Sequence, residues 1–332
     1  MACGLGNAGN MGNKVLQYLV YLALRTAVML IQACPLEVLQ AVARVLGSLL
    51  YWIDKRHRER AIEHLTQAFG HEWSPERIRA TARTCCQHLV MLGIEILSLA
   101  KMINRFNWYR YVDLSAIDEA LRVVLDDRGI ILVTGHFGNW ELMGYVIGAL
   151  GVRTYAVARP IDNPYIERWF LRTREETGQT ILSKFGATDL MMRVIESQQP
   201  LCFLADQHAG KRGVWVDFFG RKASTYRSIA LLSLQMNCPI AVGGAWRLGN
   251  RFRFHGEIND VIDPRDYADD PNAVENITAR YTRSLERLIR NAPEQYLWMH
   301  RRWRDPPPPR PRRQSAASRN ASGRTAGRPD AG

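Results

Sequence analysis

The segment of residues 130–150, IILVTGHFGNWELMGYVIGAL, constrains the fold most, because a strand pattern changes into a helix pattern within a few residues. Residues 130–134 form a short apolar, β-branched run, typical of a strand that is buried on both faces. Asn139 is a favourable N-cap, and apolar residues follow it at helical spacing: Leu142, Met143, Val146, Ile147 and Leu150. The sequence therefore predicts an α/β fold in which a buried strand runs through a short turn into a helix.

His136 lies in this turn, at the edge of the sheet where open α/β folds bind ligands. Glu141 lies in the first helical turn, and an imidazole that is still in the turn can fold back over its carboxylate. The carboxylate would hold one ring nitrogen and leave the other to accept a proton from a hydroxyl. Gly135 and Gly138 would let a substrate approach the backbone. The alternative, structural hydrogen bonding near a helix start, stays open at this point.

Several common chemistries leave no pattern in the chain. No second histidine follows Glu141 at the spacing of a helical zinc site, and neither a G-x-S-x-G elbow nor a G-x-x-x-x-G-K-[ST] loop is present. The six cysteines form no C-x-x-C pair, which favours reduced thiols in a domain that faces the cytosol. The sequence predicts neither a metal nor a cofactor.

Three further motifs follow in order: RPIDNP at 159–164, DQHAG at 206–210 continuing into GVWVDFFG, and PEQYLWMHRRWR at 293–304. Together with GHFGNWE, they resemble the late acyltransferases of lipid A biosynthesis, the lauroyl and myristoyl transferase family that also includes mycobacterial phosphatidylinositol mannoside acyltransferases. The resemblance extends over roughly residues 36–304. It includes RHRERAIEHLTQAF at 56–69, which looks like the family's Arg-rich entry helix.

This resemblance implies a glycerolipid-acyltransferase-like fold, a mixed sheet flanked by helices. It also implies acyl transfer from an acyl carrier protein thioester to a hydroxyl of an anionic membrane glycolipid. The family's His-x4-Glu motif maps onto His136 as general base and Glu141 as its orienting carboxylate. Transfer from sulfur to oxygen is downhill, so the base must mainly deprotonate the alcohol, and an imidazole with a pKa of about 6.5 suits that role.

The resemblance also implies substrate-binding residues. Arg159 and Arg174 match positions that hold phosphate or the donor, and Asp206 matches the acid of the DQ motif. His208 departs from the family, in which many members carry an acid, and this departure leaves the acceptor open. From the residues alone, backbone N–H groups at the helix start near Asn139 are expected to stabilise the oxyanion, so Asn139 joins the expected substrate-binding set.

Residues 15–33 are nearly all apolar and long enough to cross a membrane, but Arg25 interrupts them. A central arginine costs about 2.5–3.5 kcal/mol on insertion scales, so a transmembrane helix, a helix in the membrane plane and an ordinary core helix all stay open. Basic residues downstream favour a catalytic domain at the cytoplasmic face of the cell inner membrane: Lys55, Arg56, Arg58 and Arg60. We expect an anchoring segment at 1–34 and the acyltransferase domain at 35–304.

The net charge of +12 favours anionic partners, namely a membrane surface, a phosphorylated glycolipid and an acidic carrier protein. Residues 305–332 are rich in Pro, Arg, Ser, Ala and Gly, which predicts a disordered tail. Without a nucleic-acid motif in the remainder, we expect no nucleic-acid partner. Two alternatives remain: acylation of phosphatidylinositol mannoside or a lysophospholipid from acyl-CoA, and a basic lipid-binding protein without catalysis. An aromatic group is expected in an acyl pocket or in the core: Trp140, Trp215, Phe218 and Phe219.

Overall fold

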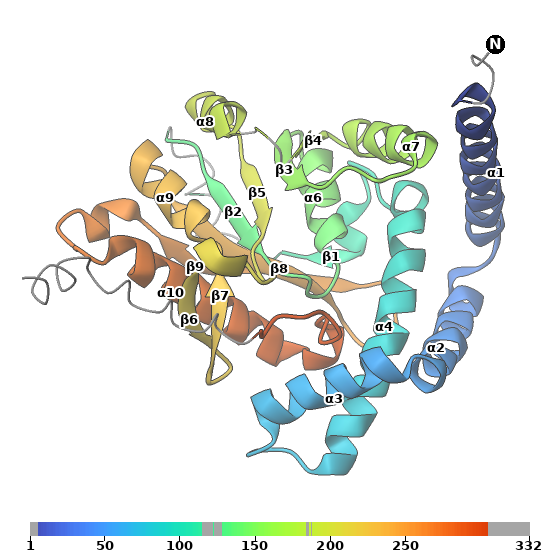
Figure 1. Ribbon diagram of the computed structural model, residues 1–332, viewed down its shortest axis with the longest axis horizontal. Coiled ribbons are helices and arrows are strands. Elements are labelled where there is room, and N and C mark those ends of the chain that lie inside the picture. The colour runs from blue at the N-terminus through green and yellow to red at the C-terminus, as the bar shows by residue number, and fades with distance from the viewer. Residues whose placement is uncertain (1–5, 115–121, 123–127, 184–185, 187, 305–332) are drawn as a thin grey trace, which may run out of the picture.

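The computed structural model describes residues 6–114, 122, 128–183, 186 and 188–304 (Figure 1). Its centre is a seven-stranded sheet in the order β1-β9-β8-β2-β5-β3-β4, in which β8 and β9 are antiparallel and all other neighbours are parallel. The predicted α/β class with a mixed sheet is thus confirmed. The strands of this sheet are β1 (Val112–Asp113), β2 (Ile131–Thr134), β3 (Thr154–Ala158), β4 (Gln179–Ser183), β5 (Leu201–Leu204), β8 (Ile240–Arg247) and β9 (Phe254–Ile262). A separate antiparallel pair consists of β6 (Val214–Phe218) and β7 (Arg221–Thr225).

Helices cover both faces of the sheet. The first group is α4 (Pro75–Met102), α6 (Trp140–Ala149) and α7 (Pro164–Glu175), and the second is α8 (Thr188–Glu196), α9 (Arg227–Met236) and α10 (Ala273–Asn291). The two groups lie on either side of β2 and β5 in Figure 1. This division follows from right-handed crossovers, because the chain moves along the sheet in one direction through α6 and returns through α8 and α9. Three more helices precede these elements in the chain: α1 (Gly6–Ala33), α2 (Leu36–Ile53) and α3 (Lys55–Phe69).

The strand, turn and helix predicted at residues 130–150 are present. The strand β2 ends at Thr134, and α6 begins after Asn139, whose side-chain oxygen accepts a hydrogen bond from the Leu142 N–H at 3.0 Å. β5 lies beside β2 in parallel register, with Thr134 opposite Leu204. Because parallel strands end at the same edge of a sheet, the residues that follow β2 and β5 emerge next to each other.

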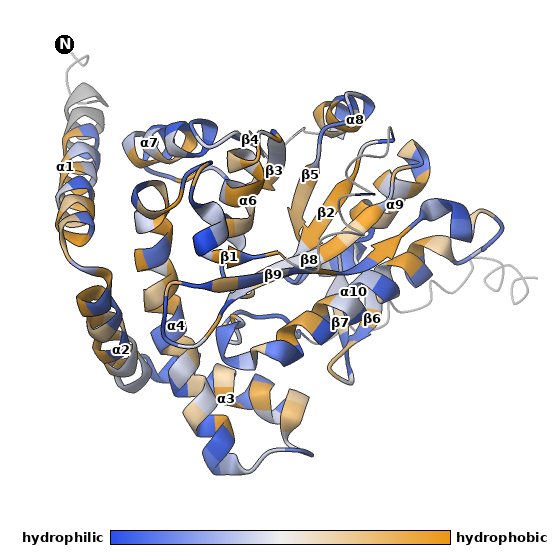
Figure 2. Ribbon diagram, turned by 180° about the vertical axis from the view of Figure 1, so that it is seen from behind, coloured by the Kyte–Doolittle hydropathy of each residue, from blue (hydrophilic) through white to orange (hydrophobic). Residues whose placement is uncertain are grey.

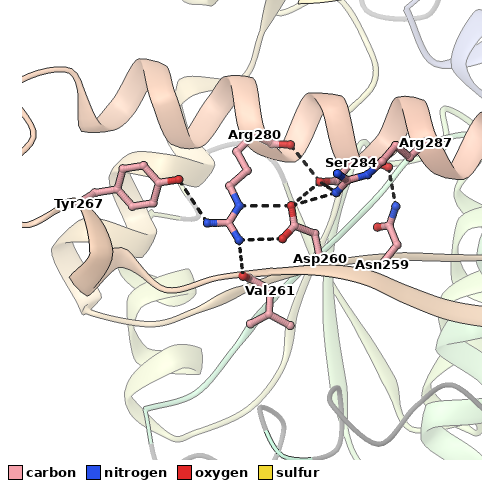
Figure 3. Close-up of polar contacts among 7 residues, drawn as sticks. All are labelled: Asn259, Asp260, Val261, Tyr267, Arg280, Ser284 and Arg287. Carbon is pink, nitrogen blue, oxygen red and sulfur yellow. Dashed lines mark hydrogen bonds and ion pairs between the residues drawn. The ribbon is translucent and has the colours of Figure 1, made fainter.

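A largely buried carboxylate on β9 joins this strand to α10 (Figure 3), on the opposite side of the molecule from α1 in Figure 1. Asp260 accepts hydrogen bonds from Arg280 at 2.9 and 3.3 Å and from the Ser284 hydroxyl at 2.5 Å, and Arg287 approaches it at 3.3 Å. Asp260 lies opposite Val242, in the first half of β8. The cluster therefore stabilises the sheet at a distance from the C-terminal end of β8.

The aromatic side chains expected in an acyl pocket divide between fully buried core residues, Phe218 and Phe219, and the half-buried Trp140 and Trp215. Phe218 and Phe219 are 1% and 3% exposed and belong to the main hydrophobic core, where Phe219 packs on Phe69 and Trp298 and Phe218 packs on Trp303. Their role is therefore core packing. Trp140 instead reaches the predicted site, where its ring lies edge-on to the His136 ring, with the ring centroids 5.0 Å apart.

α1 and α2 lie along one outer edge of the molecule, and much of their surface is apolar (Figure 2). Among the described residues, three helical segments are long and apolar enough to cross a membrane: Asn13–Ala33, Leu36–Ile53 and Pro75–Met102. Within the predicted anchoring segment of residues 1–34, the structure describes α1, which ends at Ala33. The tail predicted at 305–332 lies outside the residues that the structure describes.

Candidate active site

His136 meets a carboxylate at the edge of the sheet, and that carboxylate belongs to Asp206. The imidazole Nδ1 lies 2.8 Å from Asp206 Oδ1, and the backbone N–H of His136 donates to Asp206 Oδ2 at 2.9 Å. Asp206 follows β5 and His136 follows β2, so the parallel register of these two strands brings the pair together. Two hydrogen bonds to one carboxylate fix both the position and the rotation of the ring.

Glu141, expected to hold His136, is instead paired with Arg174. Both carboxylate oxygens of Glu141 accept hydrogen bonds from the Arg174 guanidinium, one of them at 3.2 Å. The expectation of a direct His136–Glu141 hydrogen bond is therefore wrong. Because α6 begins at Trp140, the Glu141 side chain is directed towards α7, while the imidazole turns towards β5. Sequence spacing showed that Glu141 was within reach, but the folded chain placed a second carboxylate closer.

The two glycines of the turn allow the backbone to approach other protein segments. A Cβ at Gly135 would lie 3.2 Å from the Asp206 carboxyl carbon. Gly138 has a φ of +56°, and a Cβ there would lie 1.8 Å from the Ala245 carbonyl oxygen. Both glycines therefore let the turn pack tightly between β5 and β8. Close packing within the protein therefore explains why glycine is present at both positions. The close approach of a substrate, which the sequence suggested, is not needed to explain them.

The charges around His136 favour its protonated form. Burial alone would lower the pKa of His136, but the Asp206 carboxylate and, through space, Glu141 outweigh burial, so the pKa lies above the usual 6.5. Burial would likewise raise the pKa of Asp206, yet the charge and hydrogen bonds of His136, with a contribution from His300, hold it well below its usual range. Both pKa shifts mean that the site favours a protonated His136 beside a charged Asp206 carboxylate.

The second ring nitrogen of His136 remains open to a reactant. The His136 side chain is 16% exposed, whereas Asp206 is fully buried. Within the described part of the chain, the polar contact of Nε2 is the side-chain amide of Gln207 at 3.5 Å, which is too long for a strong hydrogen bond. The ring is thus held at Nδ1, while Nε2 has no close hydrogen-bond partner among the described residues, as a general base requires.

His300 also belongs to this site, although it was not singled out in the sequence. Its Nε2 lies 3.0 Å from the Asp206 carbonyl oxygen, and its ring centroid is 6.3 Å from that of His136. Burial lowers the pKa of His300, despite the nearby Asp206. The signal for His300 was its place within the WMHRRWR motif.

Asn139 lies in the interior with both of its side-chain polar atoms occupied. Its oxygen caps α6, and its Nδ2 donates to the buried carboxylate of Glu95 at 3.1 Å. Its backbone N–H donates to the Ala245 carbonyl at 2.8 Å. Asn139 is 0% exposed and offers no polar atom to a substrate. The substrate contact expected of Asn139 therefore does not fit this geometry, and we assign it a structural role.

The two expected phosphate-binding arginines differ in their surroundings. The Arg159 side chain is 68% exposed and forms an ion pair with Asp162 at 3.3 Å. Arg174 is 21% exposed, lies over the Phe170 ring at 4.7 Å and contacts Glu141. Arg159 thus lies on the surface, while Arg174 lies inside a pocket.

This pocket is a cavity of about 220 Å³ between α1, α4, α6 and α7. Glu141 and Arg174 supply charge on one side of it. Much of the remaining wall is apolar or aromatic: Val28, Met29, Leu97, Leu99, Trp169 and Phe170. Arg25 and Glu176 also line the cavity, so its apolar wall lies beside several charged groups. This combination suits an amphipathic, lipid-like ligand.

Comparison with known proteins identifies the family of the chain. Residues 10–305 match the family model described as bacterial lipid A biosynthesis acyltransferase. The chain is 24% identical over 287 residues to the lipid A biosynthesis palmitoleoyltransferase of Escherichia coli (82% of this chain, 87% of the relative) and 23% identical over 291 residues to the lauroyltransferase of that organism (84% and 89%). It is 25% identical over 144 residues to the phosphatidylinositol mannoside acyltransferase of Mycolicibacterium smegmatis (42% and 47%). The chain is therefore an acyltransferase that belongs to the bacterial lipid A biosynthesis acyltransferase family.

Proposed function

We propose that this enzyme transfers a fatty acyl chain from an acyl carrier protein thioester to a hydroxyl of a lipid A precursor type glycolipid. The observation that carries the proposal is the His136–Asp206 pair, in which a buried carboxylate holds Nδ1 and leaves Nε2 without a close hydrogen-bond partner among the described residues. A base in this state suits the deprotonation of an alcohol. The names of the relatives support a glycolipid acceptor.

In the proposed reaction, His136 Nε2 removes the hydroxyl proton while the oxygen attacks the thioester carbonyl carbon. The carbonyl oxygen takes the negative charge of the tetrahedral intermediate. Collapse of this intermediate breaks the carbon–sulfur bond, and the thiolate takes the proton back from the imidazolium. Asp206 stabilises the imidazolium throughout. His136 therefore ends the cycle in the state in which it began.

We propose that the oxyanion is stabilised by the first-turn amides of α6 at Trp140 and Glu141. Among the described residues, neither amide has a hydrogen-bond acceptor, whereas the N–H groups of Gly138 and Asn139 donate to the carbonyls of Gln295 and Ala245. The positive end of the helix dipole adds to their effect. The amides that we propose for the oxyanion therefore belong to the two residues after Asn139.

Glu141 and Arg174 remain part of the proposed site in different roles from those expected. Glu141 would favour the imidazolium of His136 through space and would orient Arg174. Arg174 would face the charged part of a substrate, while the apolar walls of its pocket suit a hydrocarbon chain. Arg159, exposed beside Asp162, would bind phosphate at the surface.

The test uses the purified full chain with matched lauroyl, myristoyl and palmitoyl thioesters of acyl carrier protein and of CoA. Each donor is offered with a lipid A precursor, a phosphatidylinositol mannoside and a lysophospholipid, and products are identified by mass spectrometry. We expect an added ester on the lipid A precursor from the carrier-protein thioester. Products only from CoA or only on the other lipids would favour the alternative acceptors, and no product with any pair would favour a lipid-binding protein without catalysis.

The pH dependence follows from the raised pKa of His136. A general base must be neutral, so kcat/KM is expected to increase with pH and to reach its plateau only above an apparent pKa higher than 6.5. The charged or titratable groups that face the ring are Asp206, Glu141 and His300. A rate profile measured from pH 5 to 9 checks this expectation. An ascending limb centred at or below pH 6 would contradict the proposed pair.

We propose that α1 lies in the plane of the membrane at its cytoplasmic face. Its less exposed positions 17, 21, 24, 25, 28, 31 and 32 recur at helical spacing, so one face of α1 rests on the protein. Asn163, the N-cap of α7, donates to the Gln17 carbonyl at 2.8 Å, and Gln32 donates to the Leu97 carbonyl of α4 at 2.9 Å. These contacts extend over about 22 Å of helix.

This docking favours an in-plane helix over a transmembrane one. Arg25 faces the protein, 5.3 Å above the Trp169 ring, so its charge does not oppose contact of the outer face with lipid. If α1 crossed the bilayer, α7 would enter it as well, and the exposed Arg168 and Arg172 of α7 would be costly there. The outer faces of α1 and α2 expose apolar side chains: Leu16, Leu19, Leu30, Val45, Trp52 and Ile53.

Two charges on the outer face of α1 should detach the enzyme from lipid. A Leu19→Glu, Leu30→Glu variant is expected to co-sediment with anionic phospholipid vesicles several-fold less than wild type, because these side chains are 55% and 64% exposed. The matched control is Leu190→Glu, Leu231→Glu, at 38% and 39% exposed positions on α8 and α9. Equal losses in both variants would contradict the proposed face. Wild type that resists extraction by alkaline carbonate would indicate a transmembrane α1 instead.

A further inference from the structure

We propose that Glu95 and Arg247 are positioning residues, which hold the turn that carries His136 in its reactive geometry without touching a substrate. This inference rests on the proposed role of His136. Glu95 lies in the middle of α4 and Arg247 ends β8, so neither belongs to the motifs that the sequence indicated.

Glu95 connects the turn to β8. Its carboxylate is fully buried, and Oε1 accepts a hydrogen bond from Arg247 Nε at 2.5 Å while Oε2 accepts one from Asn139 Nδ2 at 3.1 Å. Asn139 in turn caps α6 through the Leu142 N–H. The Glu95 carboxylate, on α4, thus holds the start of α6 through Asn139.

Arg247 is itself held on three sides. Its backbone N–H and carbonyl pair with the side-chain amide of Gln295, each at 2.9 Å. Its guanidinium meets Glu95 on one side and His88 Nδ1, at 2.9 Å, on the other. Because Arg247 can only donate, His88 Nδ1 must be an acceptor, and the proton of this neutral imidazole lies on Nε2.

His88 completes the link to the turn. Its Nε2 lies 3.2 Å from the Gly138 carbonyl oxygen and donates to it in this tautomer. Burial and the charge of Arg247 lower the pKa of His88 to about 3, which agrees with a neutral ring. Glu95 and His88 thus hold two consecutive residues of the turn, Gly138 and Asn139, from the same helix.

A buried ion pair is an ineffective way to gain stability, because the desolvation of both charges offsets most of their attraction. Burial raises the pKa of Glu95, and the hydrogen bonds from Arg247 and Asn139 only partly reverse this shift. Such a pair provides directional contacts, and here Glu95 and His88, the two partners of the Arg247 guanidinium, each form a hydrogen bond with the turn. His136 lies two residues before Gly138, and its ring must meet Asp206 within hydrogen-bonding distance. We therefore assign the cluster to the alignment of His136.

The test compares two carboxylates that are both paired with arginine. In Glu95→Gln the side chain keeps its shape but loses its charge, and we expect kcat to fall by roughly 10–100-fold with little change in KM for either substrate. The control is Asp260→Asn, which weakens the α10 cluster shown in Figure 3 at a distance from the turn. We expect this variant to lose thermal stability while kcat stays within twofold of wild type.

Two further readouts separate positioning from mere stabilisation. The Asn139→Ser variant keeps a good cap for α6 but removes the bond to Glu95, so it is expected to lower kcat in the same way. In both variants the imidazole titration of His136, followed by NMR on the full chain, should move towards pH 6.5, because the contact with Asp206 loosens. NMR needs no substrate, so this readout does not depend on the proposed reaction.

Wild-type kcat and an unchanged His136 titration in folded Glu95→Gln and Asn139→Ser would overturn the proposal. If Glu95→Gln does not fold, Asn139→Ser alone decides. Failure of the proposed function has a different signature, since wild type itself would then show no acyl transfer in the same assay.

Discussion

Replacement of His136 by alanine is expected to lower acyl transfer by roughly 10²–10⁴-fold, because no other described side chain at this site combines an accessible ring nitrogen with a buried carboxylate partner. Alanine also leaves the Asp206 carboxylate buried without its cation, so some loss of stability is expected as well. The His136→Asn variant separates these effects. Its amide N–H can replace Nδ1 as the donor to Asp206 but provides no base.

Turnover measured with the carrier-protein thioester, together with thermal unfolding, checks this prediction. We expect His136→Asn to unfold close to the wild-type temperature and to remain inactive. The matched control is His71→Asn, which replaces a histidine that pairs with Glu72 at 2.9 Å on the surface and should keep full activity. Transfer by His136→Asn at more than a tenth of the wild-type rate would end the proposed role of this ring.

Replacement of Asp206 by asparagine is expected to have the next largest effect, again roughly 10²–10⁴-fold on kcat. An amide that donates to Nδ1 would force the proton onto Nε2, the nitrogen that must accept the hydroxyl proton. The lost negative charge also removes the main cause of the raised pKa of His136. The ascending limb of the pH–rate profile should therefore move to lower pH in this variant.

Glu141→Gln is the informative comparison. This change leaves Arg174 without its counter-ion and is also expected to lower turnover. It does not touch the Nδ1 contact, so the ascending limb and the His136 titration should move only slightly. A larger shift in Glu141→Gln than in Asp206→Asn would reverse the assignment of the two carboxylates. Rate profiles of both variants, measured over the same pH range, decide between them.

Local sequence predicted the elements around the site well. The strand before Gly135, the cap at Asn139 and the helix after it all appear within one residue of their expected limits. Periodicity and capping act over a few residues, so short-range patterns suffice to locate such elements. The apolar run at 15–33 likewise lies within α1.

A weaker signal for the positioning cluster was also present. Glu95 lies within the apolar stretch MLGIEILSLA of a long helix, and a lone acid at such a place indicates a buried, paired charge. Its partner lies 152 residues away at the end of β8. No local pattern identifies that partner, because the contact depends on how α4 packs beside the sheet.

The sequence by itself determined the class of chemistry and placed it on a strand, a turn and a helix. Apolar periodicity, caps and motifs can be read along the chain without knowing how distant segments pack. What only the tertiary structure decided was which groups meet. The parallel register of β2 and β5 places His136 beside Asp206, and the start of α6 directs Glu141 towards Arg174. The contacts of α1 with α4 and α7 direct Arg25 towards the protein. The physical reason is that hydrogen bonds and ion pairs form over about 3 Å, a distance that packing sets and sequence spacing does not.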